Sequence, residues 1–258
     1  MFTTLYYLVM VLWSALIFVL SAFALVICAP FDRRRRVVHE LTRMMARLFF
    51  AIPFGWRHRV EGMENLDRDK SYVVVMNHSH MLDIAALYFI PLNFRWVSKR
   101  EVFNIPIFGQ FLLLHGDIAI ERGRGAEAME MVIRDGKRWI GRGVSVAIFP
   151  EGTRSKTGQI GRFKAGAFNL AREAGVEVLP IVMEGTDRII GKGGRFNWRN
   201  SVTLRILPAV RCESSDHVEC RKLMDQVRED MVEALAEIRG DESKGERGKG
   251  VKLNETAK

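Results

Sequence analysis

The chain has 258 residues, 48% of them hydrophobic, and carries a formal net charge of +9 at pH 7. This length and apolar content suffice for one domain of catalytic size plus an appendage, which excludes a chain that is disordered as a whole. The three cysteines are odd in number and have no metal-like spacing. Neither a disulfide framework nor a zinc site is expected, and a reducing compartment fits best.

The amino-terminal 31 residues contain no charged side chain. Residues 5–29 predict a helix about 37 Å long, which exceeds the hydrocarbon core of a bilayer, about 30 Å. Basic residues follow this segment at 33–36, whereas a secretory signal peptide carries its charge before the apolar run. We therefore expect a retained membrane anchor. The arginines would place the following chain on the cytoplasmic side of the cell inner membrane.

Residues 37–52 form the next predicted helix. Its apolar side chains recur at helical spacing until Pro53 ends the pattern. The polar side chains on the opposite face are His39, Glu40, Arg43 and Arg47. Such a stripe commonly packs on a globular core, but this one adjoins an apolar anchor and a run of arginines. We therefore expect it to lie on an anionic membrane surface, so that residues 1–56 form a membrane-docking module.

From residue 57 to residue 239 the pattern is that of an α/β domain. Short apolar runs predict strands at 72–76, 94–98, 117–120, 144–149, 177–183 and 202–207. Helical patterns lie at 82–90, 125–141, 164–174 and 216–239. Strands that alternate with helices predict a largely parallel central sheet covered by helices. Segment 240–258 mixes charges with glycine and lacks apolar periodicity, so we expect it to be disordered and assign it no function.

The stretch VVVMNHSHMLD, residues 73–83, places two histidines and an aspartate directly after an apolar run. In an unbroken helix His78 and Asp83 would point about 140° apart, so they can meet only if His78 lies before the helix. With Asp83 in the first helical turn, its carboxylate could fix the tautomer of the imidazole and stabilise the imidazolium. His78 is therefore a candidate general base, although a histidine in a polar loop is more often structural.

This pair has no nucleophile of its own to activate. Ser79 is adjacent, but a neighbour in sequence does not usually have the geometry of a triad partner. The proton would therefore come from a hydroxyl of the substrate. His80 competes for the role of base, and we expect it to be a supporting or surface group.

A second polar segment, FPEGTRSKTG at residues 149–158, follows the apolar run VSVAI. In open α/β sheets, ligands bind at such strand ends. Gly152 permits close approach of the backbone, Thr153 offers a hydroxyl, and Arg154 has a planar fork that suits a phosphate. The segment therefore predicts one wall of a binding site.

Two further cations follow predicted strands, Lys99 in RWVSKR and Arg122 in GDIAIERGRG. With Arg154 they could surround a dianion, although each alone is also compatible with a solvated loop charge. A nucleotide site is not predicted, because neither GxxxxGK[ST] nor GxGxxG follows a strand. Nucleic acid is not expected as a partner either, because the positive charge lies beside an apolar anchor, where phospholipid headgroups are the nearer anion.

Taken together, these motifs resemble those of the glycerolipid acyltransferases. NHSHMLD resembles their NHxxxxD block, GDIAIER their second block, FPEGTRS their third and LPIV, residues 179–182, their fourth, in the same order and spacing. The similarity runs from about Arg57 to Val210, and the pair of NHxxxxD with FPEGTRS is highly specific. Glu121 stands where aspartate is frequent, which is a minor departure. Within this family the chain is most similar to the 1-acylglycerol-3-phosphate acyltransferases.

The resemblance implies an enzyme of phospholipid biosynthesis that uses no metal or other cofactor. It implies that His78 deprotonates the sn-2 hydroxyl of lysophosphatidic acid while Asp83 orients the imidazole. The hydroxyl would attack the thioester of acyl-CoA or acyl-carrier protein and give phosphatidic acid without an acyl-enzyme. Both lipids reside in the membrane, so membrane phospholipid is an implied partner.

The resemblance also assigns residues to the substrate side. The residues implied to hold the acceptor phosphate are Lys99, Arg122 and Arg154. The residues implied to shape the pocket are Glu151, Gly152 and Thr153. The amino-terminal helices would dock this site against the bilayer.

Two other functions remain open. An acyltransferase for another lysolipid, such as lyso-ornithine lipid, would share every motif, and a comparison of acceptors would separate the two. A non-catalytic membrane lipid-binding protein would explain the amino-terminal region but not the histidine at a strand end. Measured turnover would exclude it.

Overall fold

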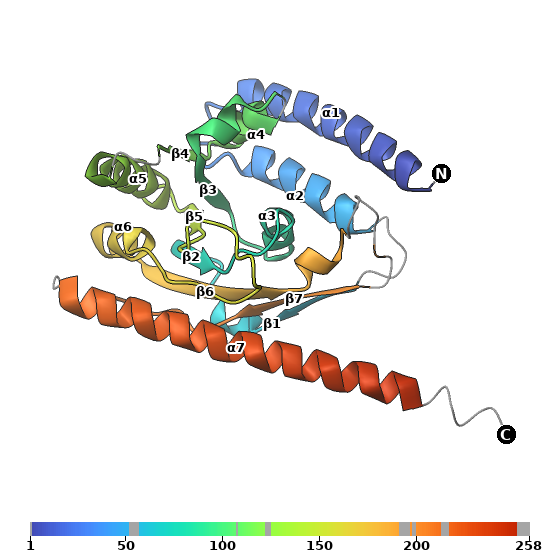
Figure 1. Cartoon of the computed structure of the whole chain (residues 1–258). Coiled ribbons are helices and arrows are strands. Elements are labelled where there is room, and N and C mark those ends of the chain that lie inside the picture. Colours follow the sequence, from blue (N-terminus) through green and yellow to red (C-terminus); the bar gives the residue numbers. More distant parts are fainter. Residues whose placement is uncertain are drawn as a thin grey trace.

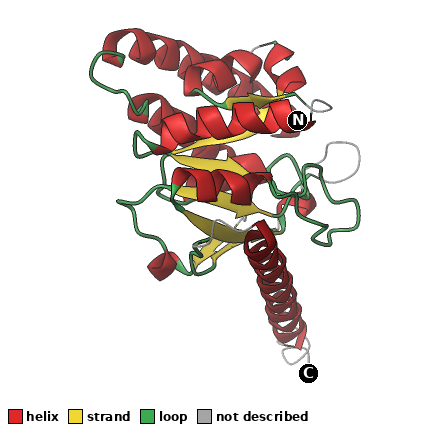
Figure 2. Cartoon of the chain, turned by 90° about the vertical axis from the view of Figure 1, so that its left-hand side faces the viewer, coloured by secondary structure: helices red, strands yellow, loops and turns green. Residues whose placement is uncertain are grey.

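The computed structural model describes residues 2–51, 57–106, 108–121, 125–190, 197, 200–212 and 217–251. A seven-stranded sheet forms the centre, in the order β1-β7-β6-β2-β5-β3-β4. The strands are β1 (Arg57–Glu61), β2 (Tyr72–Met76), β3 (Phe94–Lys99), β4 (Ile118–Ile120), β5 (Ser145–Ile148), β6 (Glu177–Glu184) and β7 (Ser201–Ile206). Helices flank the sheet, as Figure 1 shows, and a view from the left-hand side shows the strands stacked between them (Figure 2).

Five neighbouring strands, from β6 to β4 in the sheet order, run parallel. Strand β7 pairs antiparallel with β6, and β1 pairs parallel with β7 at the sheet edge. The predicted largely parallel α/β fold is confirmed, and all six predicted strands are present with ends within one residue. Strand β1 was not predicted, because its sequence RHRVE is largely exposed and has no apolar run.

The helices are α1 (Phe2–Cys28), α2 (Arg36–Ala51), α3 (Asp83–Ala86), α4 (Phe108–His115), α5 (Gly125–Ile140), α6 (Gly166–Ala174) and α7 (His217–Val251). Short 3-10 turns are η1 (Met63–Asn65), η2 (Leu87–Phe89), η3 (Arg100–Asn104) and η4 (Thr186–Arg188). The predicted helix at 82–90 is α3 followed by η2. Helix α4 was not predicted.

Helix α7 is longer than predicted. It continues to Val251, although we expected disorder from residue 240, and residues 252–258 lie outside the described part of the chain. Among the side chains of this helix that the structure describes, the last buried apolar one is Ile238. Glutamate, lysine and arginine follow it together with four glycines, which disfavour a helix, so the sequence contains no signal for this extension.

The core occupies both faces of the sheet. On one face, α2 and α3 pack against strand side chains that include Val74 and Met76 of β2. On the other face, α5, α6 and α7 pack against a set that includes Val73 and Val75. Successive side chains of a strand point to opposite faces, so β2 is buried along its whole length. This burial places the end of the strand at Met76, where the polar segment begins.

Helix α2 packs on the α/β domain with one face, while the expectation that its apolar stripe lies on a membrane surface stays a prediction. Its buried side chains are Val38, His39, Thr42, Ala46 and Phe50. Val37 and Met44, which we assigned to the apolar face, are exposed, while His39 is only 1% exposed. The buried face is therefore rotated relative to the predicted stripe, which is possible because His39 finds a buried hydrogen-bond partner.

A buried polar network joins α2 to the sheet. His39 Nδ1 is 2.9 Å from His115 Nε2 at the end of α4, and His115 Nδ1 is 2.7 Å from Asp117 Oδ1. The same carboxylate oxygen accepts the backbone N–H of Trp96 in β3 at 2.7 Å. Burial lowers the pKa of His39 and of His115, so both imidazoles are neutral at pH 7. The network makes α2 a fixed part of the domain.

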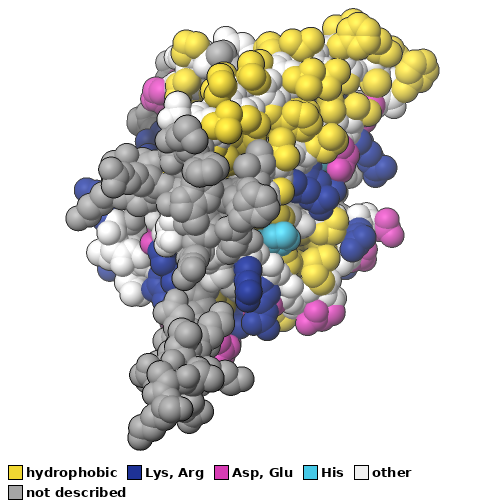
Figure 3. Space-filling model, turned by 90° about the vertical axis from the view of Figure 1, so that its right-hand side faces the viewer, with side chains coloured by type: hydrophobic (Ala, Val, Ile, Leu, Met, Phe, Trp, Pro, Cys, Tyr) yellow, Lys and Arg dark blue, Asp and Glu magenta, His cyan; other side chains and the backbone are white. Residues whose placement is uncertain are grey.

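Helix α1 lies alongside α2 and reaches α4 (Figure 1). Tyr6, Ile17 and Ser21 are buried on this side of the helix. The opposite face exposes large apolar side chains, including Leu12 at 63% and Val19 at 62%. Figure 3 shows apolar side chains gathered at the top of the molecule, over α1. By length and composition alone, Thr4–Cys28 is apolar and long enough to cross a membrane.

Replacing Asp117 with alanine is expected to destabilise the fold strongly. The change leaves the buried N–H groups of Trp96 and His115 without their acceptor, at about 1 to 3 kcal/mol each, or roughly 2 to 6 kcal/mol together. Asp135→Ala is the matched control, because Asp135 pairs with Arg134 on the surface of α5 and such pairs contribute about 0 to 1 kcal/mol. Chemical denaturation in detergent measures the free energy of unfolding of both variants. Similar losses of stability in the two would contradict the role of the network.

Candidate active site

The polar segments predicted to carry chemistry meet at one edge of the sheet. Strands β2, β5 and β6 are neighbours and run parallel, so the segments after Met76, Ile148 and Glu184 lie side by side at their carboxyl ends. The side chain of Asn77 joins two of these ends. Its Nδ2 donates to Met183 O and its Oδ1 accepts the N–H of Met183, both at 2.8 Å.

His78 and Asp83 meet as the spacing predicts. Strand β2 ends at Met76, Asp83 is the first residue of α3, and His78 Nδ1 lies 2.8 Å from Asp83 Oδ2. The same oxygen accepts the backbone N–H groups of Ser79 and His80 at 2.8 and 2.9 Å. The side chain of Asp83 has no exposed surface, and that of His78 is 14% exposed. The turn before α3 thus surrounds the carboxylate with donors in place of water.

The contact with Asp83 selects the tautomer of His78. An ionised carboxylate only accepts hydrogen bonds, so Nδ1 carries the proton and Nε2 keeps a lone pair. The imidazole stacks on Phe149 with ring centroids 3.9 Å apart, and Phe149 stacks on Trp96 at 5.0 Å. The carboxylate and the stacked rings fix the plane of the imidazole. In this orientation Nε2 can accept a proton from a bound hydroxyl.

The carboxylate of Glu151 holds the backbone near His78 through hydrogen bonds. Its Oε1 accepts the N–H of His78 at 3.0 Å, and its Oε2 accepts the N–H of Gly161 at 2.8 Å. The N–H of Ser155 donates to His78 O at 2.7 Å, so the loop after β5 holds His78 through both its N–H and its C=O. The carboxylate of Glu151 therefore acts within the protein, and its influence on a pocket passes through the position of His78.

Gly152, Thr153 and Arg154 form the tip of the same loop. Gly152 has a φ of 70°, in the left-handed region that favours glycine, and a Cβ there would lie 3.0 Å from Lys164 Nζ. Lys164 therefore lies over this turn, and its backbone N–H donates to Pro150 O at 2.9 Å. Thr153 and Arg154 are exposed. Sequence reasoning missed Lys164, because no strand end or motif residue marks it.

Of the two other predicted cations, the structure places one. Lys99 is the last residue of β3 and is exposed at the edge of the sheet that carries His78. Arg122 lies outside the described residues. Its neighbour Glu121 pairs with Arg100, with Oε1 2.5 Å from Nε.

His80, the competing histidine, is not the partner of Asp83. Its ring Nδ1 accepts the N–H of Leu82 at 3.3 Å, and only its backbone N–H binds the carboxylate. Partial burial lowers the pKa of His80, against the opposing effect of the nearby Asp83 and Asp187. This geometry fits the supporting role that the sequence predicts for His80.

Thr186 contacts the buried carboxylate and was not predicted from the sequence. Its hydroxyl donates to Asp83 Oδ1, the oxygen that His78 does not use. Thr186 is fully buried, at the start of η4 and directly after the Gly185 turn that ends β6. The two residues are 103 positions apart, so no local spacing relates them.

Two arginines of α7 hold the segment that follows FPEGTRS. Arg228 donates from Nε to Gly161 O at 2.7 Å and from Nη2 to Ile160 O at 3.0 Å. Arg239 donates from Nη2 to Gly158 O at 2.8 Å. Because Gly161 in turn donates to the carboxylate that holds the backbone of His78, the carboxyl-terminal helix helps to position the site.

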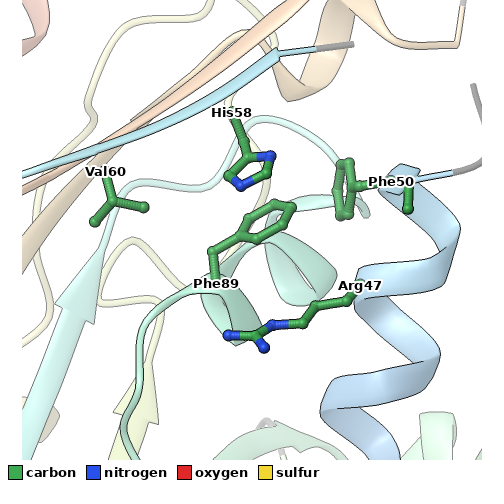
Figure 4. Close-up of a pocket in the computed structure, with 6 residues that line it drawn as sticks. Arg47, Phe50, His58, Val60 and Phe89 are labelled. Atoms are coloured by element: carbon green, nitrogen blue, oxygen red, sulfur yellow. The ribbon is translucent and has the colours of Figure 1, made fainter. Parts of the chain in front are cut away.

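A pocket of about 340 Å³ opens between the end of α2, β1 and η2 (Figure 4). The residues that line it are Arg47, Phe50, Ala51, His58, Val60 and Phe89. The ring of His58 stacks on Phe89, with centroids 4.1 Å apart. None of the predicted site residues that the structure describes lines this pocket.

Within the described part of the chain, no group of three or more His, Cys, Asp or Glu side chains is arranged to hold a metal ion. The expectation that the reaction needs no metal or other cofactor stays a prediction.

The chain matches known proteins over most of its length. Residues 57–184 match the family model described as Acyltransferase. The chain is 31% identical over 238 residues to the 1-acyl-sn-glycerol-3-phosphate acyltransferase of Pseudomonas aeruginosa, which covers 92% of this chain and 91% of that protein. It is 30% identical over 237 residues to the human 1-acyl-sn-glycerol-3-phosphate acyltransferase alpha. The matched part is 92% of this chain and 83% of that protein.

Plant and algal relatives are longer proteins. The chloroplastic 1-acyl-sn-glycerol-3-phosphate acyltransferase LPAT1 of Arabidopsis thaliana is 34% identical over 204 residues, which is 78% of this chain and 56% of that protein. The chain likewise spans about half the length of the related proteins from Brassica napus and Chlamydomonas reinhardtii.

A solved structure shares the fold. The crystal structure of the 1-acyl-sn-glycerophosphate (LPA) acyltransferase PlsC from Thermotoga maritima has a TM-score of 0.64 and 26% identity, and the match covers 90% of this chain and 98% of that one. The family model spans both His78 and Asp83 as well as FPEGTRS. The chain therefore belongs to the acyltransferase family that includes the 1-acyl-sn-glycerol-3-phosphate acyltransferases.

Proposed function

We propose that this protein transfers an acyl chain from acyl-CoA or acyl-carrier protein to the sn-2 hydroxyl of 1-acylglycerol-3-phosphate, giving phosphatidic acid. The observation that carries the proposal is the hydrogen-bonded pair of His78 and Asp83 at the carboxyl ends of parallel strands. The names of the matched relatives specify this acceptor and support it.

In the proposed mechanism His78 is the general base. Its Nε2 takes the proton of the acceptor hydroxyl as the oxygen attacks the thioester carbonyl, and Asp83 stabilises the imidazolium. The tetrahedral intermediate then expels the thiolate, which takes the proton back from Nε2. Because the nucleophile is the hydroxyl of the lipid, no acyl-enzyme forms. Neither a metal nor another cofactor takes part.

The acceptor phosphate is held by cations around the same edge. Lys99 and Arg154 are exposed there, and Arg122 is the third residue assigned to this role. Charge-assisted hydrogen bonds from such groups bind a phosphate dianion strongly. The loop at 151–154 shapes the pocket, and Lys164, which lies over this loop, adds a further cation.

The exposed face of α1 docks the protein on the membrane. Burying apolar side chains such as Leu12 and Val19 in lipid is favourable by about 25 cal/mol for each Å² removed from water. The arginines at 33–36 attract anionic headgroups and favour the cytoplasmic side of the inner membrane. Because α1 packs along the domain, docking brings the domain to the lipids that it acts on.

His78→Ala is expected to lower turnover by roughly 10² to 10⁴-fold, the usual contribution of a general base. Asp83→Asn should also be severe, because the amide can donate to Nδ1 and reverse the tautomer. His80→Ala removes an imidazole from the same loop and is the matched control, with only a small loss expected. The measurement is the initial rate of acyl transfer to lysophosphatidic acid from each donor, for the purified and folded wild-type protein and its variants.

The outcomes of this assay separate the alternatives. More than about a tenth of wild-type turnover in His78→Ala would show that the base is misassigned. Faster turnover of lyso-ornithine lipid than of lysophosphatidic acid by the wild-type protein would reassign the acceptor. No turnover of any lysolipid would favour the non-catalytic lipid-binding protein.

Arg154→Ala is expected to lower kcat/KM for the acceptor about ten- to a hundredfold, because it removes a charge-assisted bond worth roughly 1.5 to 3 kcal/mol. The KM of the acyl donor should change less. Arg134→Ala is the control, since Arg134 is an exposed arginine of α5. Steady-state kinetics with each substrate varied in turn provides the measurement, and an unaltered acceptor kcat/KM in Arg154→Ala would remove this residue from the site.

Placing two charges on the exposed face of α1, with Leu12→Glu and Val19→Glu together, is expected to weaken binding to vesicles at high salt at least about tenfold, because two apolar anchors are lost. At low salt the arginines at 33–36 should retain part of the binding to anionic vesicles. Val218→Glu alters a similarly exposed residue of α7 and should bind as wild type does. Co-sedimentation with vesicles measures the binding of the wild-type protein, the double variant and Val218→Glu. Equal binding by the three proteins would contradict docking through α1.

A further inference from the structure

The carboxylate of Asp83 accepts four hydrogen bonds, three on one oxygen and one on the other. Oδ2 takes the bonds from the ring of His78 and from the N–H groups of Ser79 and His80. Oδ1 takes the bond from the hydroxyl of Thr186. The other three donors lie within residues 78–80, whereas Thr186 follows β6, so this bond connects the pair to another strand.

The turn at Gly185 and the contacts around it fix the position of Thr186 beside the carboxylate of Asp83. Gly185 has a φ of 94°, and a Cβ there would lie 2.1 Å from Ser201 O, so the turn at the end of β6 requires glycine. Asn200 Nδ2 donates to Gly185 O at 2.7 Å and holds the turn from the start of β7. The bonds between Asn77 and Met183 hold the end of β6 against the end of β2. Thr186 is thus a rigid, fully buried donor.

We propose that Thr186 is a positioning residue that keeps Asp83 ionised and sets the proton affinity of the His78–Asp83 pair. The inference rests on the proposed function, in which this pair is the general base. It assigns to Thr186 an effect on proton transfer that a residue with only a packing role would lack.

The sign of the effect follows from where the negative charge lies. Before His78 takes a proton, the charge of Asp83 has no cationic partner in the pair, and the hydroxyl of Thr186 stabilises it. After protonation, the positive charge of the imidazolium also stabilises the carboxylate of Asp83. Removing the hydroxyl therefore destabilises the unprotonated pair more than the protonated one, which raises the apparent pKa of the pair.

Other charged groups near the pair must be the same in all variants. They are His80, Arg154 and Asp187, together with Glu151, which holds the backbone of His78. Thr186→Val changes none of these residues and nearly keeps the shape of the side chain. A shift between wild type and this variant therefore reports on the hydroxyl.

The test is an NMR titration of His78 in full-length protein in detergent, labelled with ¹⁵N-histidine and assigned with His78→Gln. In Thr186→Val the apparent pKa is expected to rise by about 0.5 to 1 unit, and the acid limb of kcat/KM to move to higher pH by a similar amount. Thr186→Ser keeps a donor and should match wild type. Thr42→Val removes a buried hydroxyl from α2 and should also match it.

The expected result is a shift in Thr186→Val alone. An unshifted titration in folded Thr186→Val would overturn the inference, and so would an equal shift in Thr186→Ser, since the hydroxyl would then not be the cause. If valine prevents folding, Thr186→Ala takes its place with the same expected shift. The titration needs no substrate, so it decides the inference even if no lysolipid is turned over, a result that would count against the proposed function alone.

Discussion

A carboxylate without exposed surface must find its hydrogen-bond donors inside the protein, and the site is built around this requirement of Asp83. Its donors come from the turn after β2 and from η4 after β6, so these two strands have to end side by side. The paired bonds between Asn77 and Met183 secure that arrangement. The loop after β5 then completes it, because Glu151 ties the backbone of His78 to Gly161.

The parts of the fold that the sequence predicted well are those governed by local pattern. Strands buried on both faces must be continuous apolar runs, which is why six strands could be placed within one residue. The meeting of His78 and Asp83 was predictable because the two residues are five positions apart and joined by one turn. Thr186 reaches the site from a segment 103 positions away, and this contact requires the strand order, which is known only from the structure. Lys164 folds back over Gly152 within the loop between β5 and α6, and no periodicity or spacing encodes such a contact.

Helix α2 shows how a missed element can mislead the reading of another. The amphipathic pattern assigned His39 to the polar face, because its position in the helix lies opposite the apolar stripe. Its partner His115 closes α4, a helix that was not predicted, and Asp117 follows directly. Once these partners are present, Nδ1 of His39 has a buried hydrogen-bond partner, and α2 can turn this face to the sheet. One face of the basic helix therefore packs into the core of the domain.

The packing of α1 against the domain also bears on how the protein would sit on a bilayer. An anchor joined by a loose tether would leave the attached domain free to tumble, so that its site would face the lipid only part of the time. Tyr6, Ile17 and Ser21 are buried between α1 and its neighbours, and Tyr6 Oη donates to Phe49 O at 2.8 Å. A bilayer that covers the outer face of α1 would thus hold the whole molecule at one tilt, with the strand ends that carry His78 at one height above the lipid.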